Sequence, residues 1–194
     1  MLILPIAILV VLAFWIVSIY NFFVSSKARI KAAVQEIGNQ LKRQSDLIPN
    51  IEASVKGYLS HEKGIFEELT NARKAISAAS KSGDVNEMAD AGKLLSDVLP
   101  KIQIIVESNP ELKGAEVVTN LMDELRDTSD KVMYARRLLI DLTADFNVKR
   151  VTFPSSLIAN LFKISEQEGL KTSEKGEHLE VKGKEMQTPK VDLG

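Results

Sequence analysis

The stretch LILPIAILVVLAFWIVSIYNFFV, residues Leu2–Val24, decides how this chain is organised. It is almost wholly apolar, and no Lys, Arg, His, Asp or Glu occurs from Leu2 to Ser26. As a helix it would extend roughly 35 Å, which is enough to cross a hydrocarbon core of about 30 Å. Only a helix can cross there with its own backbone hydrogen bonds satisfied. A signal peptide would need a basic start and a shorter apolar run, so we predict an uncleaved transmembrane anchor over residues 1–26.

The residues that flank this span predict its orientation. Lys27, Arg29 and Lys31 follow it closely, whereas no Lys or Arg precedes it. An excess of basic residues marks the cytoplasmic side of a membrane helix. We therefore expect a single-pass protein of the cytoplasmic (inner) membrane, with its N-terminus outside and its C-terminal domain in the cytoplasm. The same three cations are candidates for contact with anionic lipid headgroups, the alternative being an ordinary solvated helix face.

No turn signal separates the span from the chain that follows. Apolar residues continue at helical spacing through Ile30, Ile37 and Leu41, so the membrane helix is expected to run directly into the first helix of a soluble part. We expect the next break over residues 45–50, where Asp46 can cap a new helix and Pro49 is tolerated in a first turn.

Residues 27–164 predict helices rather than strands. A second helix would carry apolar residues at alternating steps of four and three from Ile51 to Ala79, and would end at Ser82–Gly83–Asp84. A third would precede Asn109–Pro110, with Pro100 kinking it or shifting its register. A fourth would follow Gly114, with seam residues from Val118 to Phe146, until the segment 153–156 breaks it. The fold class expected is therefore all-α: a membrane helix that continues into an antiparallel four-helix bundle, residues 27–164.

The last part of the chain differs from the predicted bundle. A short apolar helix, Leu157–Phe162, is expected after the break at Phe153–Pro154. Residues 165–194 are highly charged and contain no aromatic residue, and no periodicity persists in them. Because such a segment buries too little apolar surface to offset chain entropy, it predicts a disordered tail.

Composition excludes several classes of function. The 25 basic and 26 acidic residues give a net charge of −1, which argues against a protein built to hold nucleic acid. The absence of Cys excludes disulfides, thiolate metal sites and a thiol nucleophile. Two His residues leave little for metal binding.

Several short motifs, in order and at compatible spacing over residues 15–163, resemble the LemA family. They are Tyr20–Asn21, the run from Gln40 to Arg43, Asp46–Leu47–Ile48–Pro49–Asn50, Val55–Lys56–Gly57–Tyr58, His61–Glu62, the run from Asn109 to Lys113, Ala135–Arg136–Arg137, Phe146–Asn147 and Phe153–Pro154–Ser155. The resemblance implies one N-terminal membrane helix and a helical bundle, and it implies no established molecular activity. The family usually has two Tyr-Asn pairs near the end of the last long helix, and here Leu139–Ile140 replaces the first and Phe146–Asn147 continues the second.

The residues singled out in these motifs, as family-motif or structural polar positions, are better explained as parts of the fold than as catalytic groups. They are Asn21, Asp46, Pro49, Asn50, Tyr58, His61, Glu62, Arg136, Asn147 and Pro154. His61–Glu62 lacks the second His of a zincin helix because residue 65 is Ile, and it lacks the Glu of a di-iron Glu-x-x-His because residue 58 is Tyr. Glu62 falls on the apolar seam, where a buried carboxylate needs a donor, and Arg136 is a candidate for that donor.

These observations predict a non-catalytic interaction or scaffold protein with no metal and no cofactor. Its expected partners are the lipid bilayer and either other membrane proteins or a second copy of the chain, with no nucleic acid. One alternative is a membrane-surface binding or shaping protein that presses Leu157–Phe162 on lipid. Another is a membrane-bound enzyme that uses carboxylates such as Glu62 and Asp130.

Overall fold

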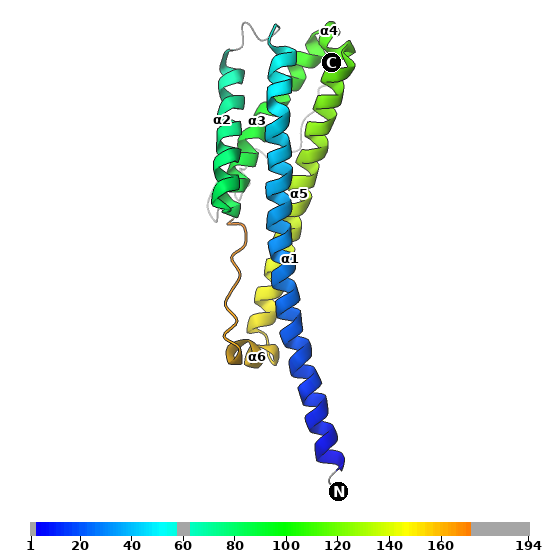
Figure 1. Ribbon diagram of the computed structural model, residues 1–194, viewed down its shortest axis with the longest axis vertical. Coiled ribbons are helices and arrows are strands. Elements are labelled where there is room, and N and C mark those ends of the chain that lie inside the picture. The colour runs from blue at the N-terminus through cyan, green and yellow to red at the C-terminus, as the bar shows by residue number, and fades with distance from the viewer. Residues whose placement is uncertain (1–2, 58–62, 172–194) are drawn as a thin grey trace, which may run out of the picture.

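The computed structural model describes residues 3–57 and 63–171, and within them every regular element is a helix. The helices are α1 (Ile3–Val55), α2 (Lys63–Ser82), α3 (Val85–Ser108), α4 (Pro110–Gly114), α5 (Glu116–Val151) and α6 (Ser155–Leu161). The four long helices α1, α2, α3 and α5 run alternately up and down and form an antiparallel bundle, from which the first part of α1 projects alone (Figure 1). This is the all-α architecture expected from the sequence.

Helix α1 is one unbroken helix of 53 residues, so the apolar span does continue into the bundle. The break expected over residues 45–50 is wrong. Pro49 lies inside the helix. Asp46 does not cap a helix; its Oδ2 lies 3.1 Å from Lys42 Nζ, one turn earlier in α1. Burial explains the continuity, because Leu47, Ile48, Ile51 and Val55 carry the buried face of α1 straight through the proline. The helix ends instead at a turn over Lys56–Gly57.

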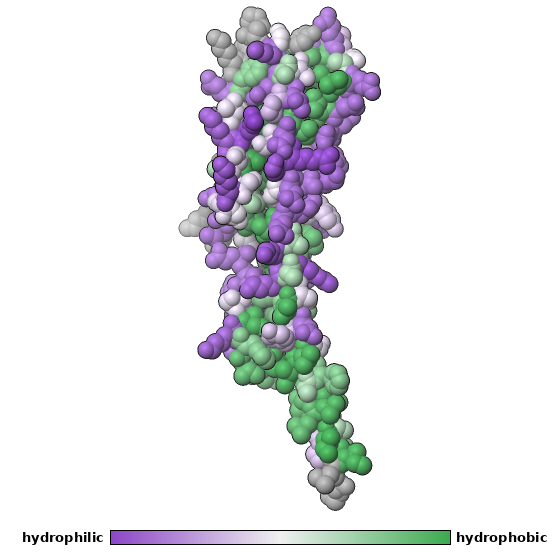
Figure 2. All heavy atoms as spheres, in the orientation of Figure 1, coloured by the Kyte–Doolittle hydropathy of each residue, from purple (hydrophilic) through white to green (hydrophobic). Residues whose placement is uncertain are grey.

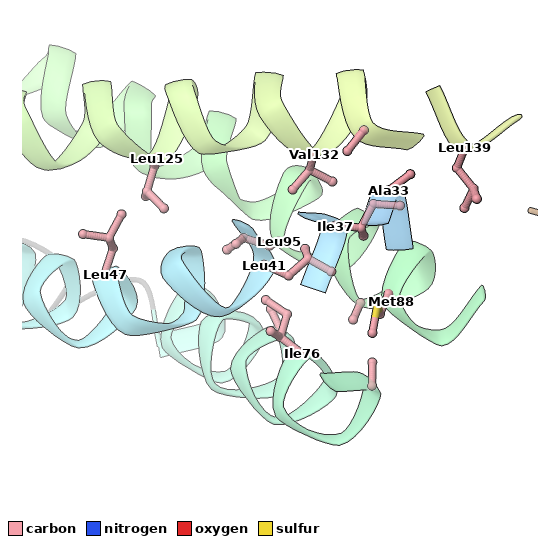
Figure 3. Packing of buried hydrophobic residues seen from close by; sticks show 14 of the residues in the cluster. Ala33, Ile37, Leu41, Leu47, Ile76, Met88, Leu95, Leu125, Val132 and Leu139 are labelled. Atoms are coloured by element: carbon pink, nitrogen blue, oxygen red, sulfur yellow. The ribbon is translucent and has the colours of Figure 1, made fainter. Parts of the chain in front are cut away.

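The core lies where side chains of all four long helices meet (Figure 3). Ile37 and Leu41 of α1 are fully buried against Leu95 of α3 and Ile76 of α2. The seam predicted for the second helix is confirmed from Ile65 onward, since its members in α2 are all buried: Ile65, Leu69, Ala72, Ile76 and Ala79. Gly92 lets α3 approach α1 closely, because a Cβ there would lie 3.1 Å from Leu41 Cδ2.

The helices associate mainly as two pairs, α1 with α5 and α2 with α3. Each pair carries an ion pair on its outer surface. Arg43 of α1 donates from Nε and Nη2 to Glu124 Oε1 of α5, at 2.8 and 2.6 Å, and Lys101 of α3 binds Glu68 of α2 at 2.6 Å. Contact between α3 and α5 is much less extensive, so one side of the bundle is open.

Helix α3 begins at a well-defined cap. The Asp84 carboxylate accepts from the backbone N–H groups of Asn86 and Glu87, at 2.7 and 3.3 Å. These bonds, that of Asn86 first, hold the pKa of Asp84 below its ordinary value of 3.8 because they favour the charged carboxylate. The helix continues through Pro100 to Ser108.

The chain does not lose its structure at residue 164. Residues 163–171, here called the strap, run back from α6 along the bundle toward the α2–α3 turn (Figure 1). Asn147 of α5 donates to the Gln167 carbonyl at 2.9 Å and accepts from its N–H at 3.0 Å. The Lys171 N–H donates to Asn86 Oδ1 at 2.9 Å. Residues 165–171, which were expected to be part of a disordered tail, are therefore ordered along the bundle, and the rest of that prediction, residues 172–194, lies outside the described part of the chain.

Candidate interaction surfaces

The structure spreads the residues singled out from the sequence over the whole molecule instead of gathering them into one site. On α1, Asn21, Asp46 and Asn50 are exposed and Pro49 is half-buried. Lys27, Arg29 and Lys31 are also exposed on α1, just beyond the apolar stretch. Pro154 lies in the turn between α5 and α6. Tyr58, His61 and Glu62 lie outside the described residues, so the expected pairing of Glu62 with Arg136 is untested.

Two hollows adjoin each other on the open side of the bundle, between α3 and α5. Together we call them the lateral groove; their volumes are about 180 and about 370 Å³, and Ser96 and Ser129 line both. The other lining residues are Gln44, Ala89, Asp90, Gly92, Lys93, Asp97, Leu99, Pro100, Gln103, Met122, Leu125, Arg126, Val132, Met133 and Arg136. No pattern in the sequence indicates this groove, because it arises from the distance at which α3 and α5 pack.

The floor of the groove is polar and fixed. Gln44 projects into it from α1 with 3% of its surface exposed, and its Nε2 donates to Ser129 Oγ of α5 at 2.8 Å. A buried amide that is hydrogen-bonded to a neighbouring helix fixes how the two helices align. Around it the groove offers apolar Leu99 and Met133 together with charged side chains, among them the half-buried Arg136. Such a lining suits an amphipathic protein segment better than a small charged ligand.

The second surface is the end of the bundle from which α1 projects. It exposes six large apolar side chains at the end of α5, in the following turn and around α6, and we call these the apolar end: Val148, Val151, Phe153, Leu157, Leu161 and Phe162. In Figure 2 hydrophobic atoms cover this end and continue without interruption onto the projecting part of α1, whereas the bundle above it is mainly hydrophilic on the side shown.

Aromatic contacts fix α5 and α6 to a defined level of α1. The rings of Tyr20 and Phe162 lie 4.9 Å apart, and Phe23 meets Phe146 edge to face at 5.2 Å. Ile158 and Ala159 of α6 are buried in the same cluster as Ile19 and Phe23. Helix α6 thus packs one face on the bundle, as a core helix does, and exposes Leu157 and Leu161 on the other.

In the described ranges, no group of three or more His, Asp or Glu side chains could hold a metal ion. Asp130, one of the carboxylates considered for chemistry, is exposed on α5.

Of the helices described, α1 alone is long and apolar enough to span a membrane, and very little of its most apolar stretch is buried against the rest of the protein.

The model of the LemA family matches residues 33–189. The chain is also similar to the magnetosome protein MamQ of Magnetospirillum gryphiswaldense, with 24% identity over 163 residues that cover 72% of this chain. The matched region spans 60% of the length of that relative. The exposed apolar helix and this likeness fit a membrane protein.

Proposed function

The chain belongs to the LemA family, and from this membership and the geometry above we propose that it is a membrane-anchored, non-catalytic interaction protein. The observation that carries the proposal is that one helix serves two purposes. Its N-terminal part exposes apolar side chains along a membrane-spanning length, and its C-terminal part is the central helix of the bundle. The bundle would therefore stay tied to the membrane for as long as α1 spans it.

The bundle would present the lateral groove to its partner. The groove runs between α3 and α5, where the bundle lacks the close helix pairing found on its other sides. A helix of another membrane protein, or of a second copy, would complete the packing there. Exposed Met133 and half-buried Arg136 would supply an apolar contact and a charge-assisted hydrogen bond.

We place the bundle in the cytoplasm, at the inner membrane. Lys27, Arg29 and Lys31 support this orientation, since all three are exposed on α1 directly after the apolar stretch. At that level they would also meet anionic headgroups, each contributing about 1 kcal/mol.

Site-specific photo-crosslinking in intact cells tests the groove. A photoreactive residue replaces Met133, which lines the groove with 66% of its surface exposed. The matched control replaces Tyr134, the next residue on α5, which is 70% exposed and does not line the groove. We expect a discrete adduct from position 133, and we expect it to be lost when Arg136→Glu is added but retained with Arg137→Glu. An equal adduct from position 134, or none from 133, would refute the groove as the docking surface.

A further inference from the structure

The level of Lys27 sets a depth scale along α1. Lys27 is the first charged residue after the apolar stretch, and a hydrocarbon core needs about 20 apolar helical residues, which α1 offers only before Lys27. At 1.5 Å per residue, Tyr20 lies about 10 Å and Trp15 about 18 Å below Lys27 along the axis. If α1 spans the bilayer as proposed above, both residues lie within the span.

The end of α5 and the whole of α6 lie at the same levels. A hollow of about 510 Å³ lies between α1 and the end of α5. It is lined from α1 by Trp15, Ser18, Ile19 and Phe22, from α5 by Asp145, Val148 and Lys149, and after α5 by Thr152, Phe153, Pro154 and Ser155. The Phe162 ring lies 4.9 Å from that of Tyr20. Because the contact between Phe162 and Tyr20 is direct, the end of α6 lies at the level of Tyr20, and the α5–α6 turn faces Trp15, Ile19 and Phe22 across the hollow.

The sequence from Val151 to Phe162 is compatible with a position in the apolar layer of the membrane. No ionisable residue occurs from Val151 to Phe162, and the segment is bounded by Lys149–Arg150 on one side and Lys163 on the other. The large side chains that it exposes are all apolar; among them, Phe153 is 76% and Leu161 is 69% exposed. Basic residues at both ends can extend their charged groups toward the headgroups while the segment between them stays in the apolar layer.

The hydrogen bonding of the segment is internal, as an apolar surrounding requires. Thr152 Oγ1 donates to the Val148 carbonyl at 2.7 Å, and Ser155 Oγ donates to the Lys149 carbonyl at 2.7 Å. The Ser155 hydroxyl thereby satisfies a carbonyl in the last turn of α5, and the Val148 carbonyl also accepts from the Thr152 N–H at 3.0 Å. At the end of α6, the Phe162 N–H donates to the Ile158 carbonyl and the Ile164 N–H donates to the Ala159 carbonyl.

We infer that Val151–Phe162 is a second membrane-seated element, which enters the leaflet on the bundle side and returns without crossing. Its ligand is the acyl-chain region of the bilayer just below the headgroups. The element and α1 together would fix both the depth and the tilt of the bundle, because one helix alone can rotate and tilt in a bilayer. The inference rests on the proposed anchoring by α1, and its test separates the two.

The test uses the full chain in phosphatidylcholine vesicles. Since the sequence has no Cys and one Trp, Leu161→Cys gives a unique site for a small fluorophore and Trp15 reports on the anchor. Val117→Cys is the matched control, an apolar residue of α5 that is 67% exposed, at the opposite end of the bundle. Quenching is measured with aqueous iodide and with lipids that carry a spin label near the headgroup.

We expect the label at position 161 to be quenched several-fold less by iodide than the label at 117, and strongly by the shallow spin-labelled lipid. Equal iodide quenching at 161 and 117, while lipid spin labels still quench Trp15, would overturn the inference and leave the anchor intact. If Trp15 itself is quenched by iodide and not by lipid, the anchor fails and this inference fails with it.

Discussion

At the scale of single residues, Asn147 has a role that its motif did not reveal. The motif indicates only a structural polar position, and in the structure Asn147 binds the backbone of Gln167 in the strap. That partner could not be predicted, because the strap has no hydrophobic periodicity. It is held by scattered polar bonds and by the partial burial of Ile164 and Leu170. Its close packing is visible at Gly169, where a Cβ would lie 2.9 Å from Thr143 Oγ1.

We expect Asn147→Ala to release the strap. The change removes two hydrogen bonds, each worth about 0.5–1.5 kcal/mol, so the loss of unfolding free energy should be about 1–3 kcal/mol. Hydrogen exchange should show the Gln167 amide losing protection while the core of α1 keeps it. Asn160→Ala, at an exposed position of α6, is the control. Unchanged protection at Gln167 would contradict the assigned contact.

The Asp84 cap predicts a pH dependence. The pKa of Asp84 is lowered in the folded protein, so the unfolded chain binds more protons at pH values just below 3.8. The cap's contribution is therefore complete above that value and is lost as the pH falls through the lowered folded pKa. Thermal unfolding of the wild type and of Asp84→Asn, followed by circular dichroism, should show a difference that shrinks as the solution is acidified.

Asp84→Asn keeps an acceptor for the N–H groups of Asn86 and Glu87 without a titrating group, and Asp84→Ala removes the cap altogether. We expect the alanine variant to unfold at a lower temperature than the wild type and the asparagine variant at neutral pH. A difference between wild type and Asp84→Asn that grows on acidification would reverse the assigned sign.

At the scale of elements, the sequence predicted the helices better than their ends. The seam of α2 and the stop at Gly83 follow from side-chain spacing, which is a local property. The break at residues 45–50 was wrong because packing overrides a local turn signal: Leu41, Ile48, Ile51 and Val55 lie on one buried face. The lateral groove is set by the separation of α3 and α5, which no local pattern encodes.

Because α3 lies close to α1 at Gly92, we expect a larger side chain there to lower the free energy of unfolding. Gly92→Leu should force Leu41 aside, since even a Cβ at residue 92 lies 3.1 Å from its Cδ2. We expect a destabilisation of about 1–3 kcal/mol in denaturant unfolding, the usual cost of overpacking. Gly64→Leu in α2 is the control, because no atom lies within 4 Å of a Cβ there. Equal stability of the two variants would contradict the close contact.

At the scale of the whole molecule, the orientation in the membrane can be tested by introducing single cysteines, because the sequence contains none. Ser108→Cys lies at the exposed end of α3, and Ile3→Cys lies at the start of α1. If the bundle is cytoplasmic, a membrane-impermeant maleimide should label position 108 only after spheroplasts are lysed, and position 3 before lysis. The reverse pattern would invert the proposed topology.

The central claim is that one continuous helix serves as both membrane anchor and core of the bundle. The most direct test is a pulsed electron paramagnetic resonance distance between spin labels at Val17→Cys and Asn39→Cys, both exposed on α1, with the full chain in lipid nanodiscs. An unbroken helix places the two backbone positions about 33 Å apart, so we predict a single narrow distribution near that value. A broad distribution, or one centred at a clearly shorter distance, would show that α1 breaks between the membrane and the bundle and would contradict the account.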